Sequence, residues 1–202
     1  MKLFRRAVCL CAAVVLPACG GEESPGGVEE GPGTQESALV LAVSRGCTFE
    51  LTSAVRAGTI PPIHDITLSR LATESCRWPA ASAWVGSSVI LTPCLALVAN
   101  DLGVAVGYTM KNNYSGSSPV TVGLRNVDPE LMTVVRTSGL AVYLGTGSVF
   151  LSYLSIQVDG TTLTVGGSKS GRIGGETGTG GNYVATFPDF FTSTTAPTVV
   201  AY

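Results

Sequence analysis

The chain has 202 residues, of which 45% are hydrophobic and only 13% are charged, and its formal net charge is −2. This balance excludes a disordered acidic chain, which needs low hydrophobicity and high net charge. It also argues against a nucleic-acid-binding protein, which needs clustered Lys and Arg. Val, Ile and Thr number 24, 6 and 22. Because β-branched residues pack well on a pleated sheet, the composition predicts a β-rich fold.

The first residues have the pattern of an export signal. Lys2, Arg5 and Arg6 form a positive region, and a ten-residue apolar run follows at 7–16. A run of this length is too short to cross a bilayer as a helix, and it is typical of the hydrophobic part of a signal peptide.

The segment Leu16-Pro17-Ala18-Cys19 resembles a bacterial lipobox, with Leu at −3, a small residue at −1 and the invariant Cys. The resemblance implies that residues 1–18 are a signal peptide and that Cys19 becomes diacylated. An ordinary signal peptide, with Cys19 left as a thiol, is the alternative. Gly20 stands where the familiar inner-membrane retention signal has Asp, so the resemblance points to the outer membrane.

Residues 19–43 are expected to comprise the acylated cysteine and a solvated tether. The 20–37 part holds five Glu, six Gly, two Pro and no basic residue, and such a segment cannot bury a core. From residue 45 onward, nine Lys and Arg balance nine Asp and Glu. Residues 44–202 are therefore predicted to form a single neutral β-domain, which would not steer a charged partner over long distances.

The domain is predicted to begin with a hairpin. Residues 47–57 alternate between apolar and polar side chains, as a half-buried strand does. The segment 58–65 contains two adjacent prolines and is expected to be a loop, and 66–76 would be the returning strand. Pairing the ends of this hairpin would place Leu51 opposite Ala72.

Further strands follow at regular spacing. In 102–110 the even positions are large and the odd ones small, so one face belongs to a core and the other allows close packing. The segment 149–158 is apolar on both faces, as in a central strand, and Asp159-Gly160 predicts a hairpin turn. The Gly-rich segment 166–181 is expected to be a long exposed loop. About ten short strands without an amphipathic helix predict an antiparallel β-sandwich or a Greek-key barrel.

Three cysteines lie in the predicted domain, and export implies an oxidising route. We expect a Cys47–Cys76 disulfide, because these two residues fall at matching ends of the proposed hairpin. Cys94 lies among leucines and resembles a buried small hydrophobe. Pairings of Cys94 with either of the other two stay open, and an unacylated Cys19 would allow two bridges.

The sequence offers no recognisable catalytic set. The single histidine, His64, is expected to be a solvated loop residue, so a Ser-His-Asp hydrolase lacks a base. One His and scattered thiols also argue against a metal site. The Gly-rich loop 166–182 holds Lys169 and Arg172 but lacks the Gly-Lys-Ser/Thr ending of a phosphate-binding loop.

Two groups of residues are candidates for ligand binding, because loops carry function on β scaffolds. The first is Lys169 and Arg172 in the Gly-rich loop. The second is aromatic and consists of Tyr183, Phe190 and Phe191, which precede the last strand. Core packing is the favoured interpretation of these aromatic residues, and contact with a glycan or a protein is the alternative.

These features predict a lipid-anchored envelope protein with a non-catalytic β-domain that binds a glycan or protein partner or is structural. Its membrane contact would be the lipid anchor only, on the periplasmic face or at the cell surface. An envelope hydrolase using Ser or carboxylate chemistry is the alternative, and an assembly component with an unpaired edge strand is a third hypothesis. No cofactor, metal or nucleic acid is expected.

Overall fold

The computed structural model describes residues 40–143 and 147–202. The regular elements in these residues are β-strands arranged in three sheets. The predicted signal peptide, Cys19 and the tether up to residue 39 lie outside the described residues. The first strand begins at Val40, four residues before the predicted start of the domain at residue 44. Val40 and Ala42 pack against the apolar core and extend the sheet by one strand.

The first sheet is an antiparallel meander in which each strand pairs with its neighbour in sequence. The predicted alternation in its second strand is confirmed, since Cys47, Phe49 and Leu51 are fully buried and the residues between them only partly. The strands are β1 (Val40–Ser44), β2 (Cys47–Val55), β3 (His64–Arg70) and β4 (Ala81–Ser88).

The returning strand of the first hairpin begins earlier than predicted. β3 starts at His64, so Leu51 pairs with Leu68 and not with Ala72. The reason is that the loop ends just after its two prolines, where backbone N–H donors become available for the ladder again. Cys76 therefore lies in the β3–β4 connection and not at the end of the hairpin.

The predicted Cys47–Cys76 disulfide is confirmed, and it joins the start of β2 to the β3–β4 connection. It therefore closes the three-strand meander β2–β3–β4 at one end and does not simply cross-link a hairpin. Cys94 is half-buried and is also disulfide-bonded. The interpretation of Cys94 as a small hydrophobe left without a bridge is wrong.

The second sheet is a second four-stranded antiparallel meander and forms the middle layer of the molecule. Its strand β6 is buried on both faces, as the alternation of large and small residues predicted. Val106 and Tyr108 face the first sheet, whereas Ala105 and Gly107 face the third. The strands are β5 (Leu95–Asn100), β6 (Gly103–Met110), β7 (Thr121–Val127) and β8 (Val134–Leu140).

The third sheet has the order β10-β11-β13-β14-β12, with β9 paired to the far end of β11. All its pairs are antiparallel except β12 with β14. The strands are β9 (Ser148–Val149), β10 (Tyr153–Ile156), β11 (Leu163–Ser170), β12 (Glu176–Gly178), β13 (Asn182–Phe187) and β14 (Thr198–Ala201).

Two predictions for this sheet are corrected and one is confirmed. The Asp159-Gly160 hairpin is confirmed, because β10 and β11 pair across it and the Asp159 carboxylate accepts hydrogen bonds from both backbone N–H groups that follow the turn. The segment 149–158 is not a central strand but a broken edge strand, with Val158 fully exposed. The segment 166–181 is not one long loop, because it contributes the second half of β11 and all of β12.

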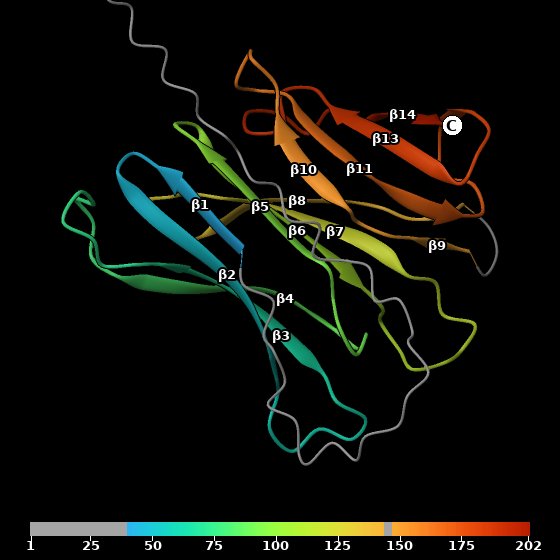
Figure 1. The fold of residues 1–202 in the computed structure, drawn as a ribbon, viewed down its shortest axis with the longest axis horizontal. Coiled ribbons are helices and arrows are strands. Elements are labelled where there is room, and N and C mark those ends of the chain that lie inside the picture. The colour runs from blue at the N-terminus through green and yellow to red at the C-terminus, as the bar shows by residue number, and fades with distance from the viewer. Residues whose placement is uncertain (1–39, 144–146) are drawn as a thin grey trace, which may run out of the picture.

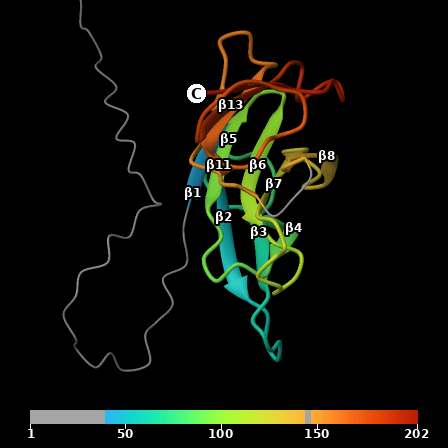
Figure 2. The same cartoon turned by 90° about the vertical axis from the view of Figure 1, so that its right-hand side faces the viewer.

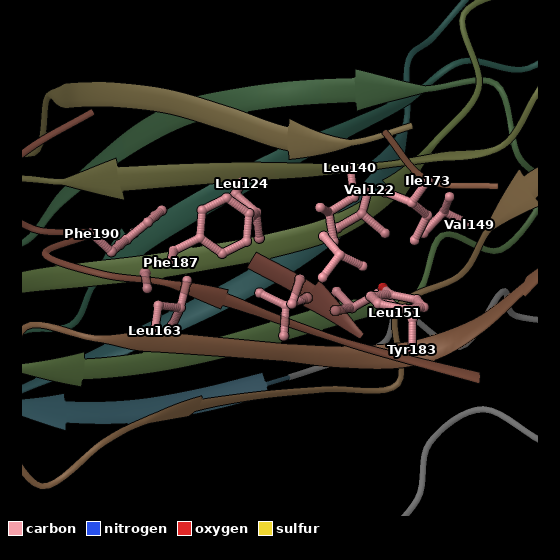
Figure 3. Packing of buried hydrophobic residues seen from close by; sticks show 14 of the residues in the cluster. Val122, Leu124, Leu140, Val149, Leu151, Leu163, Ile173, Tyr183, Phe187 and Phe190 are labelled. Carbon is pink, nitrogen blue, oxygen red and sulfur yellow. The ribbon is translucent and has the colours of Figure 1, made fainter. Parts of the chain in front are cut away.

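The three sheets stack as layers, with β5–β8 between the N-terminal and the C-terminal strands (Figure 1), and the turned view keeps this order (Figure 2). Each interface between layers holds its own apolar core. Phe187, Leu124 and Leu163 meet at one end of the second core, and Ile173 and Val149 meet at the other (Figure 3). The antiparallel sandwich is thus confirmed, as a stack of three sheets rather than a Greek-key barrel.

In the described parts of the chain, no helix is long and apolar enough to cross a membrane.

Candidate functional site

The three aromatic candidates are core residues. Tyr183, Phe190 and Phe191 are 0%, 5% and 6% exposed, and the two phenylalanine rings pack edge to face with centroids 5.3 Å apart. The Tyr183 hydroxyl donates to the carbonyl oxygen of Phe150 at 3.0 Å, and burial raises the pKa of Tyr183. Tyr183 and Phe191 are enclosed, and Phe190 only borders a small hollow of about 60 Å³ beside Arg136. These side chains serve packing and do not present an aromatic face to a ligand.

Lys169, the first of the two basic candidates, is also buried. Its side chain is 4% exposed and that of Glu176 is 3% exposed. The Lys169 ammonium donates to both carboxylate oxygens of Glu176, at 3.1 and 3.2 Å, and to the carbonyl oxygen of Gly171 at 2.9 Å. Lys169 therefore holds the end of β11 against the start of β12 and does not point toward solvent.

Glu176 is surrounded by donors. Besides Lys169, the backbone N–H of Ile173 donates to its Oε2 at 2.9 Å. Burial alone would raise the pKa of Glu176, but the hydrogen bonds from Ile173 and Lys169 outweigh burial and hold the pKa below its ordinary value. Glu176 is thus a carboxylate, and its charge is already matched by that of Lys169.

Arg172 is the candidate that remains accessible. Its side chain is 75% exposed, and its contacts to Glu176 are long, 3.4 Å from Nε to Oε1 and 3.5 Å from a terminal nitrogen to the backbone oxygen. The turn that carries Arg172 is held in place by its next residue, Ile173. Ile173 is buried in the second core and forms a β-bridge with Val142.

The same bridge places an exposed tyrosine beside Arg172. In an antiparallel bridge between Val142 and Ile173, Tyr143 and Arg172 lie opposite each other and on the same face. The Tyr143 N–H donates to the Arg172 carbonyl oxygen at 2.6 Å. Because Val142 and Ile173 point into the core, Tyr143 and Arg172 point outward, and Tyr143 is 69% exposed.

These residues line a solvent-open hollow of about 510 Å³, which we call the turn hollow. Its floor is largely backbone, because Gly174 and Gly175 have open space where a side chain would stand, and Gly175 has φ +75°. Of the described residues that line it, only Arg172 and Glu176 carry a charge. The lining consists of Tyr143, Gly171, Arg172, Ile173, Gly174, Gly175 and Glu176.

The prediction that His64 is a solvated loop residue is wrong. It is 4% exposed at the start of β3, where its Nδ1 lies 3.2 Å from the Ser53 hydroxyl and its Nε2 has no hydrogen-bond partner. Burial lowers the pKa of His64. The neighbouring carboxylate, Asp65, is bound instead by Arg56 and by the Trp84 indole N–H. A Ser-His-Asp triad is therefore not assembled around His64.

Within residues 40–143 and 147–202, no group of three or more His, Cys, Asp or Glu is placed to hold a metal ion.

The sequence identified Arg172 but missed Tyr143. No local pattern marks Tyr143, because its position beside Arg172 depends on a bridge between residues 31 positions apart in the chain. What the sequence showed correctly was a concentration of glycine around two basic residues, which is where the hollow lies. Comparison of the chain with protein-family models, with curated proteins and with solved structures finds no match.

Proposed function

We propose that the protein is a lipid-anchored envelope protein whose β-domain binds a glycan, without catalysis, at the turn hollow. The anchor rests on the resemblance of the segment ending in Cys19 to a lipobox. The Cys47–Cys76 disulfide supports export, because disulfides persist in oxidising compartments. The acidic, Gly-rich segment before Val40 has the composition of a tether that holds a domain away from a membrane.

The observation that carries the binding proposal is the exposed pair Tyr143 and Arg172 at the edge of the hollow. A tyrosine ring offers an apolar face to a sugar ring, and a guanidinium offers several N–H donors to its oxygens. The hollow is open to solvent, so a ligand would lie on it and not be enclosed. A protein partner would need about 800 Å² of complementary surface, so a glycan fits this site better.

The proposal is binding rather than hydrolysis because of where the reactive side chains lie. Glycoside hydrolysis by the usual route needs two carboxylates that flank the bond to be broken. The turn hollow has one carboxylate, Glu176, and its oxygens are already occupied by Lys169 and the Ile173 N–H. The Ser53–His64 contact is elsewhere, and the histidine is 4% exposed on the buried face of β3.

The test of glycan binding is a printed array of bacterial envelope oligosaccharides probed with the full chain in detergent. We expect a defined set of glycans to bind the unchanged chain and Tyr143→Ala to lose most of that signal. Trp84→Ala is the matched control, because Trp84 is a 61%-exposed aromatic residue on the first sheet. Equal losses in both variants, or no binding by the unchanged chain, would overturn the proposal.

The anchor is tested by intact-mass spectrometry of the wild type and of Cys19→Ser. Diacylation adds a lipid mass that Cys19→Ser lacks and moves the protein into the membrane fraction. Cys94 is disulfide-bonded, and its partner is not among the described residues. A thioether-linked Cys19 cannot also form a disulfide, so the anchor predicts that peptide mapping without reduction never finds Cys19 bridged to Cys94. A soluble, unmodified wild type, or a Cys19–Cys94 disulfide, would contradict the anchor.

A further inference from the structure

We infer that the turn hollow selects acidic sugars, and that Arg172 recognises a carboxylate or sulfate on the sugar while Tyr143 supports its ring. This inference rests on the proposed glycan-binding function and narrows its ligand class.

The first step is the charge at the hollow. Lys169, Arg172 and Glu176 are the charged side chains that lie together there, with Lys169 close to Glu176 and Arg172 farther from it. Two cations and one carboxylate leave one positive charge over. Lys169 and Glu176 are both buried and satisfy each other, so the excess charge resides on Arg172, the exposed member.

The second step is the number of N–H donors of Arg172 that its contacts within the protein leave available. A guanidinium carries five N–H donors in a planar fork. Two of its nitrogens approach Glu176, at 3.4 and 3.5 Å, and the acceptor oxygen Oε1 already receives a shorter hydrogen bond from Lys169. The 75%-exposed side chain therefore keeps a terminal edge available, which is the geometry that binds a carboxylate or sulfate with two parallel hydrogen bonds.

The third step is the spacing between Arg172 and Tyr143. Residues that face each other in an antiparallel bridge have Cβ atoms about 4.5–5.5 Å apart. The two side chains can thus contact one sugar unit at the same time, with the ring on the tyrosine and the anionic group at the guanidinium. Gly174 and Gly175, which line the same hollow, leave that unit room to lie against their backbone.

The fourth step is the rigidity of the pair. Ile173 is buried between the two outward-facing residues of its turn, Arg172 and Gly174, and it packs into the second core near Val149 (Figure 3). The Ile173 N–H is held by Glu176, and the Glu176 N–H donates back to the Ile173 carbonyl oxygen. The backbone that presents Arg172 is fixed before any ligand arrives, which reduces the entropy lost on binding.

The experiment compares two ligands that differ only in charge. Oligogalacturonate and its fully methyl-esterified form share the same sugar rings, and only the first carries carboxylates. Each is titrated by calorimetry into the full chain in detergent at low ionic strength. We expect the acid form to bind about tenfold more tightly than the ester, as one charge-assisted contact provides. The preference should shrink at 0.5 M NaCl, because salt screens exposed charges.

Variants assign the preference to one side chain. Arg172→Gln should bind the acid and the ester equally, and Arg172→Lys should keep part of the preference because it keeps the charge but not the fork. Arg77→Gln is the matched control, since Arg77 is exposed on the first sheet, in the β3–β4 connection. All variants change exposed side chains, and equal thermal midpoints would show that each one folds.

The outcomes separate this inference from the proposed function. Equal affinity for the acid and the ester, abolished by Tyr143→Ala, would overturn anionic selectivity and leave glycan binding intact. Loss of preference in Arg77→Gln as well as in Arg172→Gln would assign the effect to net charge and overturn the role of Arg172. Full competition by millimolar inorganic sulfate would show an anion site without sugar recognition. No binding of either ligand by a chain that binds neutral glycans on the array would also overturn the inference.

Discussion

The two cores of the molecule are built in different ways. The core between the first and second sheets is formed by two meanders of consecutive strands, and a disulfide closes its outer layer. The core between the second and third sheets depends on strands that are distant in sequence, on a parallel pair, and on a buried ion pair at its edge. The first core is held by local pairing and a covalent link, and the second is held by long-range contacts.

Glycines of the third sheet allow close packing at its edge. In the third sheet, a Cβ on Gly166 would lie 2.0 Å from the ring of Tyr153, and one on Gly167 would lie 1.9 Å from the Phe150 carbonyl oxygen. These glycines let the broken edge strand fold closely over β11. The composition predicted a long exposed loop here, whereas the absence of side chains at these positions allows close packing in the structure.

The largest expected effect is on the first core. The double variant Cys47→Ala/Cys76→Ala removes a link between residues 29 positions apart. A loop of that length corresponds to about 3–4 kcal/mol of stability through the entropy of the unfolded chain. Urea unfolding followed by tryptophan fluorescence should show this loss, and a change below about 1 kcal/mol would mean that the meander is held by packing alone.

The corresponding test of the second core removes one partner of its buried ion pair. Glu176→Ala leaves Lys169 buried without a counter-charge and should cost about 3 kcal/mol. The double variant Lys169→Met/Glu176→Leu should regain most of that loss, because it replaces the pair by apolar contacts. Equal urea midpoints for Glu176→Ala and for the double variant would mean that an unpaired Lys169 is not destabilising. The ion pair would then not be what holds the end of β11 in place.

A smaller loss is expected where the middle sheet meets the third. A Cβ on Gly107 would lie 3.0 Å from the side chains of Leu151 and Leu154, so Gly107→Leu overpacks this interface and should cost about 2 kcal/mol. Gly116→Leu is the control, because nothing lies within 4 Å of the Cβ position there. An equal midpoint of thermal unfolding for the two variants would show that the layers do not approach as described.

The smallest expected effect is a pH dependence of the first core. Burial lowers the pKa of His64 from its ordinary 6.5, so the unfolded chain binds a proton more readily than the folded one. The stability that neutral His64 contributes is therefore complete above pH 6.5 and is lost as the pH falls from 6.5 through the lower folded pKa. Urea midpoints between pH 7.5 and pH 5 should fall, and His64→Gln should flatten the profile. A steeper profile in that variant would refute the assignment.

Much of the N-terminal half could be predicted from the sequence. The alternation after Cys47 and the large-and-small pattern of β6 reflect short-range rules of strands. The Cys47–Cys76 pairing was predicted correctly from a hairpin whose register was wrong, because Cys76 lies in the β3–β4 connection. The wrong prediction of the partner of Leu51 and the wrong prediction that His64 lies in a solvated loop have one cause. A proline-containing loop has no periodicity that fixes where pairing resumes, and a shift of four residues keeps the same face inward.

Less of the candidate site could be predicted. The glycines around Lys169 and Arg172 marked its place, but which lysine or arginine is exposed depends on Glu176, seven residues after Lys169 and buried beside it. The burial of the aromatic candidates also depends on the tertiary structure. Tyr183, Phe190 and Phe191 all point into the second core.

The sequence by itself determined the all-β class and the short-range turns, because these follow from residue preferences over a few positions. Only the tertiary structure decided that there are three layers, that Lys169 is buried, and that Tyr143 stands beside Arg172. The physical reason is that these features arise from pairings between distant segments, whose free energy depends on how whole sheets stack and not on any local pattern.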